Sequence, residues 1–202
     1  SFGLNSFAVN TSGSYNCSYG AYTLYANTTG SSNTAYGQAA LYSNTTASNN
    51  TAVGYQAGYS NTTGTPNTFV GVQAGYATTT GNDNTGVGYN AIYNNTTGSY
   101  NTAVGMYAAS GLTSGTDNAA FGYLALGNNT TTGSYNTAIG SKALQANTTA
   151  NNNTAVGYQA GYANTTGARN TFVGYGSAYA TTTGAENSAF GYLALTTNTT
   201  GN

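Results

Sequence analysis

Large apolar residues recur along this chain at a fixed interval, each directly before a Gly. They belong to a motif of the type Asn-Thr-Ala-Val-Gly, as at residues 50–54. The motif starts at Asn16, Asn33, Asn50, Asn67, Asn84, Asn101, Asn118, Asn136, Asn153, Asn170 and Asn187. Nine of the ten intervals are 17 residues, and the one from Asn118 to Asn136 is 18. Such a short, fixed period is typical of a solenoid, in which each unit is stabilised by stacking on the next.

Counted from its Asn as position 1, each unit predicts short strands. Position 4 is large and apolar in all twelve units, from Phe2 through Val53 to Phe190, and we expect it to be the core stripe. Position 8 is always Ala, Ser or Thr, which suits a crowded interior site. Segments rich in Thr, Val, Tyr and Phe between Gly and Asn favour strands over helices. A unit of 17 residues has room for two strands of about five residues and their turns.

The positions between these segments predict the corners of the coil. Position 5 is Gly in every unit, which indicates a positive φ or a backbone pressed against another surface. Position 15, mostly Gly after two hydroxyl residues, marks a second turn. Four of the five charged residues, Asp83, Asp117, Arg169 and Glu186, occupy position 17. Positions 16 and 17 are therefore expected to face solvent. The inserted residue of the longer unit lies near residues 130–132, just before this corner.

The chain is predicted to be one repeat array over residues 1–202, in which residues 1–15 are a partial unit. We expect an all-β parallel β-solenoid, or β-roll, of about twelve coils of 17 residues, cut from a longer fibre. In stacked coils like residues lie above one another about 4.8 Å apart. The position 1 Asn amides are then expected to bond to one another along the axis. Since one coil has a thin core, self-association as a homotrimer or an end-to-end filament is expected.

Composition excludes several classes of protein. Only 2% of the 202 residues are charged and the net charge is −1. The two basic residues, one Lys and one Arg, cannot neutralise a nucleic-acid backbone. No apolar run approaches the roughly 20 residues of a membrane span. One Cys, Cys17, excludes a disulfide framework. The chain has no His, and its acids, Asp83, Asp117 and Glu186, lie too many coils apart to share a substrate or metal. We therefore expect no enzyme, cofactor or metal site.

Units such as residues 50–57 and 153–160, both Asn-Thr-Ala-Val-Gly-Tyr-Gln-Ala, resemble a known family. They resemble the head repeats of trimeric autotransporter adhesins of the YadA type and, more closely, repeats of bacterial and phage tail-fibre-like proteins. The resemblance implies a left-handed parallel β-roll, assembled as a homotrimer on an extracellular adhesin, cell surface or virion fibre. The chain departs from the adhesin head in its longer unit, its Thr-Thr-Gly extension and its low charge.

Two rows of residues are candidate sites. Position 10 is Tyr in seven units and is a possible carbohydrate-binding or host-surface-binding row: Tyr25, Tyr42, Tyr59, Tyr76, Tyr93, Tyr162 and Tyr179. With the frequent Leu of position 9, such as Leu41 and Leu126, this row could instead form an inter-chain surface. Position 12 carries Asn-x-Thr/Ser, a possible glycosylation signal, at Asn10, Asn27, Asn44, Asn61, Asn95, Asn129, Asn147, Asn164 and Asn198.

Three functions remain open. The first is a structural fibre: an extracellular appendage, adhesin or tail-fibre shaft that supplies length, rigidity and multivalent display. The second is recognition of surface carbohydrate through the Tyr row. The third, a minor alternative, is ice binding through Thr rows at positions 13 and 14, although adjacent residues such as Thr62 and Thr63 point to opposite sides of a strand.

Overall fold

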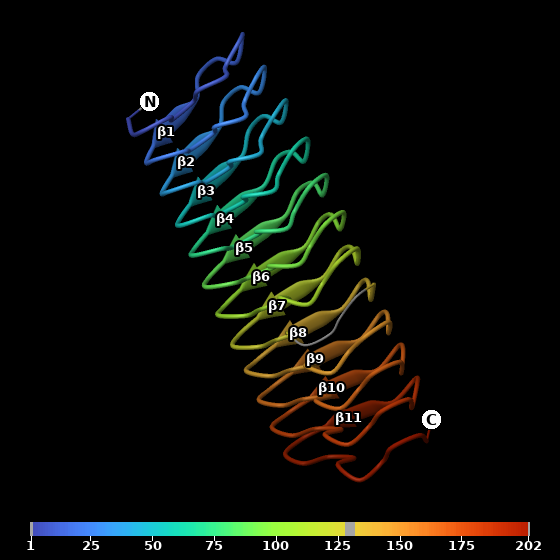
Figure 1. Ribbon diagram of the computed structural model, residues 1–202. Coiled ribbons are helices and arrows are strands. Elements are labelled where there is room, and N and C mark those ends of the chain that lie inside the picture. The colour runs from blue at the N-terminus through green and yellow to red at the C-terminus, as the bar shows by residue number, and fades with distance from the viewer. Residues whose placement is uncertain (1, 128–131, 202) are drawn as a thin grey trace.

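The chain forms a rod in which one short strand from each unit stacks on the next. The computed structural model describes residues 2–127 and 132–201. Each unit makes one coil, and the coils follow one another along a single axis from the N-terminus to the C-terminus (Figure 1). The strands are β1 (Cys17–Tyr19), β2 (Thr34–Tyr36), β3 (Thr51–Val53), β4 (Thr68–Val70), β5 (Thr85–Val87), β6 (Thr102–Val104), β7 (Ala119–Phe121), β8 (Thr137–Ile139), β9 (Thr154–Val156), β10 (Thr171–Val173) and β11 (Ser188–Phe190).

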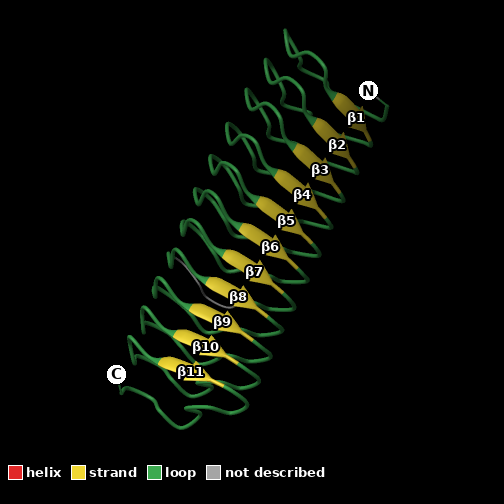
Figure 2. Cartoon of the chain, turned by 180° about the vertical axis from the view of Figure 1, so that it is seen from behind, coloured by secondary structure: helices red, strands yellow, loops and turns green. Residues whose placement is uncertain are grey.

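The strands form one parallel sheet in chain order, which confirms the predicted all-β parallel solenoid. The sheet has 11 strands and so about ten turns, with no helix in the described ranges. Thr51 pairs with Thr68 and Val53 with Val70, an offset of one unit, and this register repeats along the sheet. Phe2 adds a parallel bridge to Tyr19, so the partial first unit continues the stack. Figure 2 shows the strands along one side of the rod, with turns closing every coil.

The longer unit keeps the register of the sheet. Ala119 pairs with Thr137 and Phe121 with Ile139, so like positions still lie over one another across an 18-residue interval. The predicted insertion site near residues 130–132 lies mainly outside the described residues. The extra residue is therefore absorbed away from the strands, because pairing in the sheet fixes positions 2 to 4.

The predicted second strand of each unit is wrong. Only positions 2 to 4 form a strand, and positions 5 to 12 are a series of tight turns. In one coil Gln56 and Gly58 have φ of 53° and 60°, and most other coils repeat this alternation at positions 7 and 9. The backbone N–H of Gln56 donates to the preceding coil and that of Gly58 to the following coil. The turns are thus bonded to both neighbours, although their dihedral angles are not those of a strand.

The predicted core stripe at position 4 is also wrong, because the strand faces the other way. In every strand the central residue, position 3, is buried and positions 2 and 4 are half-buried or exposed. Phe2 and Phe190, both at position 4, are 68% and 67% exposed. Side chains alternate across a strand, so a shift of one residue moves the whole set to the opposite face. The core instead consists of positions 3, 8 and 9.

Position 9 belongs to the interior and not to an inter-chain surface. Leu24, Leu41, Leu126 and Leu144 are fully buried, whereas Leu195 in the last coil is 40% exposed. Their positive φ turns the side chain inward after the tight turn. Large and small residues alternate to fill this space. A Cβ built on Gly75 would lie 2.4 Å from the ring of Phe69, so a large residue at position 3 is accommodated by Gly at position 9.

Both explanations offered for the position 5 Gly apply together. Gly54 has a φ of 139°, and a Cβ built on it would lie 2.3 Å from the carbonyl oxygen of Gly71 in the next coil. The other position 5 glycines have φ between 118° and 137° or share the value of Gly54. This corner therefore needs a residue without a side chain, both for its backbone conformation and for coil-to-coil contact.

Two rows of buried Asn hold the coils in register. At position 1, Asn101 Oδ1 accepts hydrogen bonds from the backbone N–H (3.0 Å) and the Nδ2 (3.0 Å) of Asn118. Asn101 Nδ2 donates to the carbonyl oxygen of Gly115 at 2.9 Å, which ties the strand to the far turn of its own coil. The predicted amide row is confirmed. A second such row lies at position 12, where Asn44 Nδ2 donates to Asn27 Oδ1 at 2.7 Å.

Candidate functional site

The outer face of the sheet is an uncharged stripe that runs along the rod. Its two rows are position 2, mostly Thr, and position 4, which is Val, Ile, Phe or Tyr throughout. Phe121 and Ile139 are 39% and 41% exposed, and the Val residues of this row are half-buried. At the N-terminal end the rings of Phe2, Tyr19 and Tyr36 stack at centroid distances of 5.0 and 4.8 Å. Cys17 lies on this face too, with an exposed thiol.

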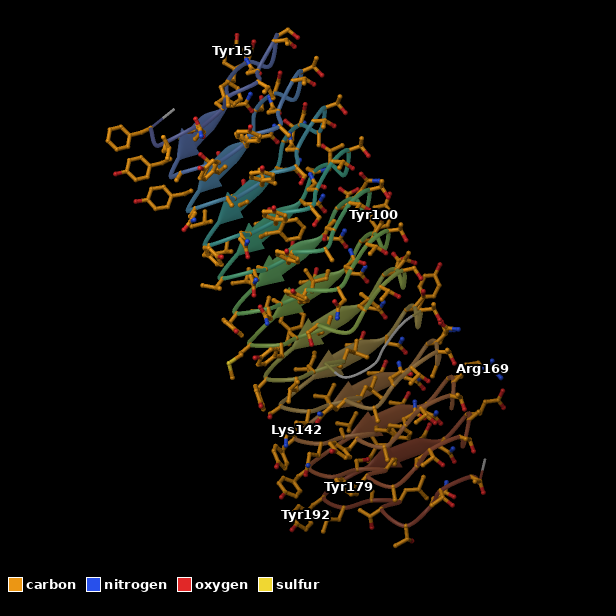
Figure 3. All side chains as sticks on the ribbon, viewed as in Figure 1. Tyr15, Tyr100, Lys142, Arg169, Tyr179 and Tyr192 are labelled. Carbon is orange, nitrogen blue, oxygen red and sulfur yellow. The ribbon has the colours of Figure 1, made fainter. Side chains whose placement is uncertain are left out.

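Four of the five charged residues, all at position 17, lie at another edge of the rod. Position 17 is exposed in every described unit, which confirms the predicted corner there, whereas position 16 is half-buried in most units. Figure 3 shows Tyr15, Tyr100 and Arg169 along this edge, opposite Lys142 and Tyr192. Arg169 Nη2 contacts Glu186 Oε1 at 2.7 Å in the next coil, a pair that is too exposed to contribute more than about 1 kcal/mol.

The acidic residues do not come together. Asp83 and Asp117 are two coils apart, about 10 Å at the strand spacing. Among the described residues, His, Cys, Asp and Glu form no group of three that could hold a metal. The described part of the chain also contains no helix long and apolar enough to span a bilayer.

The position 10 tyrosines form two stacks on the turn side of the coils. Tyr25, Tyr42, Tyr59, Tyr76 and Tyr93 stack in succession with centroid distances of 5.0 to 5.2 Å. Tyr162 and Tyr179 form a second stack at 5.0 Å, with interplanar angles of at most 11° in all these pairs. The structure therefore brings all seven candidate tyrosines into two rows. Their ring edges face outward, because the ring faces cover one another.

Because the rings of this Tyr row cover one another, we expect the free energy of unfolding to depend on pH. Burial, followed by the charge of Tyr42 and Tyr76, raises the pKa of Tyr59 above its usual value of 10.0. The folded chain then holds this proton more tightly than the unfolded chain. The stabilising contribution is complete below pH 10 and is lost as the pH rises through the folded pKa.

We expect the thermal unfolding temperature to be level near neutral pH and to fall above pH 10. Circular dichroism melts across this range would measure it. Tyr59→Phe has no phenol at this site and should show a shallower decline. Identical alkaline profiles for the two proteins would contradict the assignment to Tyr59.

The predicted glycosylation sites at position 12 lie mainly inside the rod. Asn27, Asn44, Asn61, Asn95, Asn147 and Asn164 are fully buried. Their Nδ2 atoms donate to the backbone of the position 15 residue, as in the 3.1 Å bond from Asn61 to Gly64. Asn10 and Asn198 are half-buried, and Asn129 lies outside the described residues. The folded rod leaves no room for a glycan on the six buried amides, so the structure argues against this modification there.

Where position 12 is Thr in place of Asn, the Asn row is interrupted and buried polar atoms lack hydrogen-bond partners. Thr78 and Thr181 replace Asn, and the buried Oγ1 of each has no hydrogen-bond partner. Asn61 Oδ1 and Asn164 Oδ1, which face these gaps from the preceding coils, have none either. Unpaired buried acceptors of this kind cost about 1–3 kcal/mol each.

Thr78→Asn should therefore stabilise the rod. The new amide would donate to Asn61 Oδ1 and accept from Asn95 Nδ2, which joins two separate parts of the row. We expect a gain of about 1–3 kcal/mol, measured from the denaturant midpoint. Thr80→Asn, at an exposed site in the same coil, is the control and should change stability by less than about 0.5 kcal/mol. Equal effects of the two substitutions would contradict this account of the row.

The Thr rows considered for ice binding are not equivalent. Thr62 Oγ1, at position 13, donates to the carbonyl oxygen of Thr79 at 3.0 Å, and most other coils repeat the bond. Position 14, such as Thr63, is exposed. The position 13 hydroxyls thus serve coil-to-coil bonding, and ice binding stays a prediction.

Comparison with known proteins adds no family to this description. No protein-family model, no curated protein and no solved structure matches the chain. The function of the chain is therefore inferred from the geometry of the rod and from the resemblance of its repeats.

Proposed function

We propose that this chain is a rigid segment of a structural fibre, located outside the cell or on a virion, that associates with other copies through the outer face of its sheet. The observation that carries the proposal is the position 4 row. It is apolar in every unit, yet it lies on the outside of the coil. A continuous apolar row is not needed there for the fold of a single chain. It is typical of an interaction surface.

Rigidity follows from the bonding between coils. Each coil donates backbone hydrogen bonds to both of its neighbours, through the strands and through the turns. The Asn rows add buried side-chain bonds in the same direction. From β1 to β11 the sheet extends about 48 Å at the parallel-strand spacing. Such a rod supplies length and presents each surface residue many times over.

A second copy of the chain is the partner that fits this face best. The face carries no charged residue in the described units and repeats at the coil spacing over its whole length. Only a partner with the same repeat can match row against row at every coil. The homotrimer and the extracellular or virion location are part of the proposal, and they rest on the resemblance of the repeats.

Substitution on the outer face tests this association. Val87→Asp with Val104→Asp places two charges on adjacent coils of the face without entering the core. Thr97→Asp with Ser114→Asp, at exposed position 14 of the same coils, is the matched control. Sedimentation velocity should give an oligomer, three times the 20.3 kDa chain for a trimer, for the unaltered chain and for the control. The Val double variant should be monomeric with an unchanged circular dichroism spectrum.

Two results would overturn the proposal. One is a monomeric unaltered chain at the highest soluble concentration. The other is an oligomer that survives the two Asp substitutions on the outer face. Negative-stain images that show globular particles in place of rods would contradict the structural role itself.

A further inference from the structure

The Tyr row at position 10 is broken in the middle of the rod. After Tyr93 the position is occupied by Ser110, Gly127 and Gln145, and the row resumes at Tyr162. Inside a stack both faces of each ring are covered by neighbouring rings about 5 Å away. Tyr93 has Tyr76 on one side only, at 5.1 Å. Its other face is turned toward Ser110, in the first of the three consecutive coils that lack a ring at this position.

A cavity occupies this break. It has a volume of about 230 Å³ and is lined by Tyr93, Asn90, Asn94, Tyr107, Ser110 and Gly127, with Gly111 beside them. Ser110 Oγ donates to the carbonyl oxygen of Gly127 at 2.7 Å, which joins the first two of the three ring-free coils. The volume is below the roughly 300–1,000 Å³ of sites for drug-sized ligands, so the cavity suits a single ring.

The lining combines one aromatic face with neutral polar groups. Asn90 and Asn94 supply carboxamides, Ser110 and Tyr107 supply hydroxyls, and no charged side chain lines the cavity. Asn90 Oδ1 is buried with no partner, so turning this carboxamide toward the cavity would give it a hydroxyl donor. The matching ligand is uncharged, has one apolar ring face and carries hydroxyl groups at its edge.

We propose that the break in the Tyr row binds one neutral sugar ring, stacked on the free face of Tyr93 in the place of the missing tyrosine. The C–H groups of a pyranose face meet the electron-rich ring face, and its hydroxyls meet the Asn and Ser side chains. The site lies on the turn side of the coil, away from the outer face of the sheet. It therefore goes beyond the structural role and does not depend on self-association.

Ser110→Tyr is the sharpest test of this site. Tyr is the native residue of position 10 in seven units, so the coil tolerates it, and the new ring would cover the free face of Tyr93. Tyr93→Ala removes that face instead. Tyr15→Ala, at the 91% exposed position 17, is the control for general binding to exposed tyrosines. The probes are the methyl pyranosides of glucose, galactose and mannose, and N-acetylglucosamine. Saturation-transfer NMR detects binding in the expected millimolar range.

At least one probe should bind the unaltered chain and the Tyr15→Ala control equally. Ser110→Tyr and Tyr93→Ala should each weaken that binding by at least tenfold. The proposal is overturned if no probe binds, or if Ser110→Tyr binds as well as the unaltered chain. It is also overturned if Ser110→Tyr abolishes self-association in sedimentation velocity, because a second copy would then fill the break. Val87→Asp with Val104→Asp should leave sugar binding unchanged, so the two proposals can fail separately.

Discussion

Asn101→Ala is expected to lower the free energy of unfolding of the coils around it by about 2–5 kcal/mol. The Asn101 side chain is fully buried. Its removal leaves the backbone N–H of Asn118 and the carbonyl oxygen of Gly115 without the bonds that they make to it, at 3.0 and 2.9 Å. Neither group can reach water in the folded coil. The cost of two unpaired buried backbone groups therefore adds to the cavity left by the amide.

Native-state hydrogen exchange resolves this loss coil by coil. Protection of the Asn118 amide should fall first, and the denaturant midpoint should fall with it. Thr97→Ala removes an exposed side chain close by and should shift the midpoint very little. A loss for Asn101→Ala no larger than that for Thr97→Ala would show that the Asn row does not hold the coils.

Gly54→Ala is expected to disrupt the contact between two coils, at a cost of at least about 4 kcal/mol. At a φ of 139° an L-residue is strained, and its Cβ would lie 2.3 Å from the carbonyl oxygen of Gly71. The opposing atom belongs to the backbone, so relief requires the coils to separate. Separation in turn breaks the hydrogen bonds on both sides of the corner.

Gly191→Ala separates the cost of backbone strain from the cost of the steric clash between neighbouring coils. Gly191 has a φ of 118° at the same position of its unit, but nothing lies within 4 Å of a Cβ built on it. Its loss should be limited to the backbone strain of about 1–3 kcal/mol. Chemical denaturation of the two variants gives the difference directly. Similar losses of stability in the two variants would show that the close approach of neighbouring coils is not the reason why position 5 must be Gly.

The period of the sequence was enough to predict which residues lie over one another. Asn101 stacks on Asn118 and Thr51 pairs with Thr68 because both pairs are one unit apart. This inference needed only the constant spacing and the geometry of parallel strands. The Gly54 corner could also be predicted from the sequence, since a residue that is Gly in every unit indicates a backbone requirement.

The direction of the side chains could not be predicted in the same way. In Thr51–Val53 the largest apolar residue, Val53, faces outward and the small Ala52 faces the core. Ranking the residues by size selected the wrong face, because the inward position 3 is filled by Ala in most coils and takes Phe69 only where position 9 is Gly. Leu41 is turned inward by a φ of 50°, a conformation that a Leu in the sequence does not indicate. The break at Ser110 was visible as a missing Tyr, but its cavity required the structure.

Distances between labelled positions test most directly the claim that every unit winds once around a common axis. In a chain with Cys17→Ser, nitroxide labels can be placed at exposed position 17 through Asn49→Cys with Asp117→Cys, and through Asn49→Cys with Glu186→Cys. These pairs are four and eight coils apart. Electron–electron double resonance should give label separations of about 19 Å and about 38 Å, a ratio of two. Separations that do not grow in proportion to the number of units would contradict the stacked-coil rod.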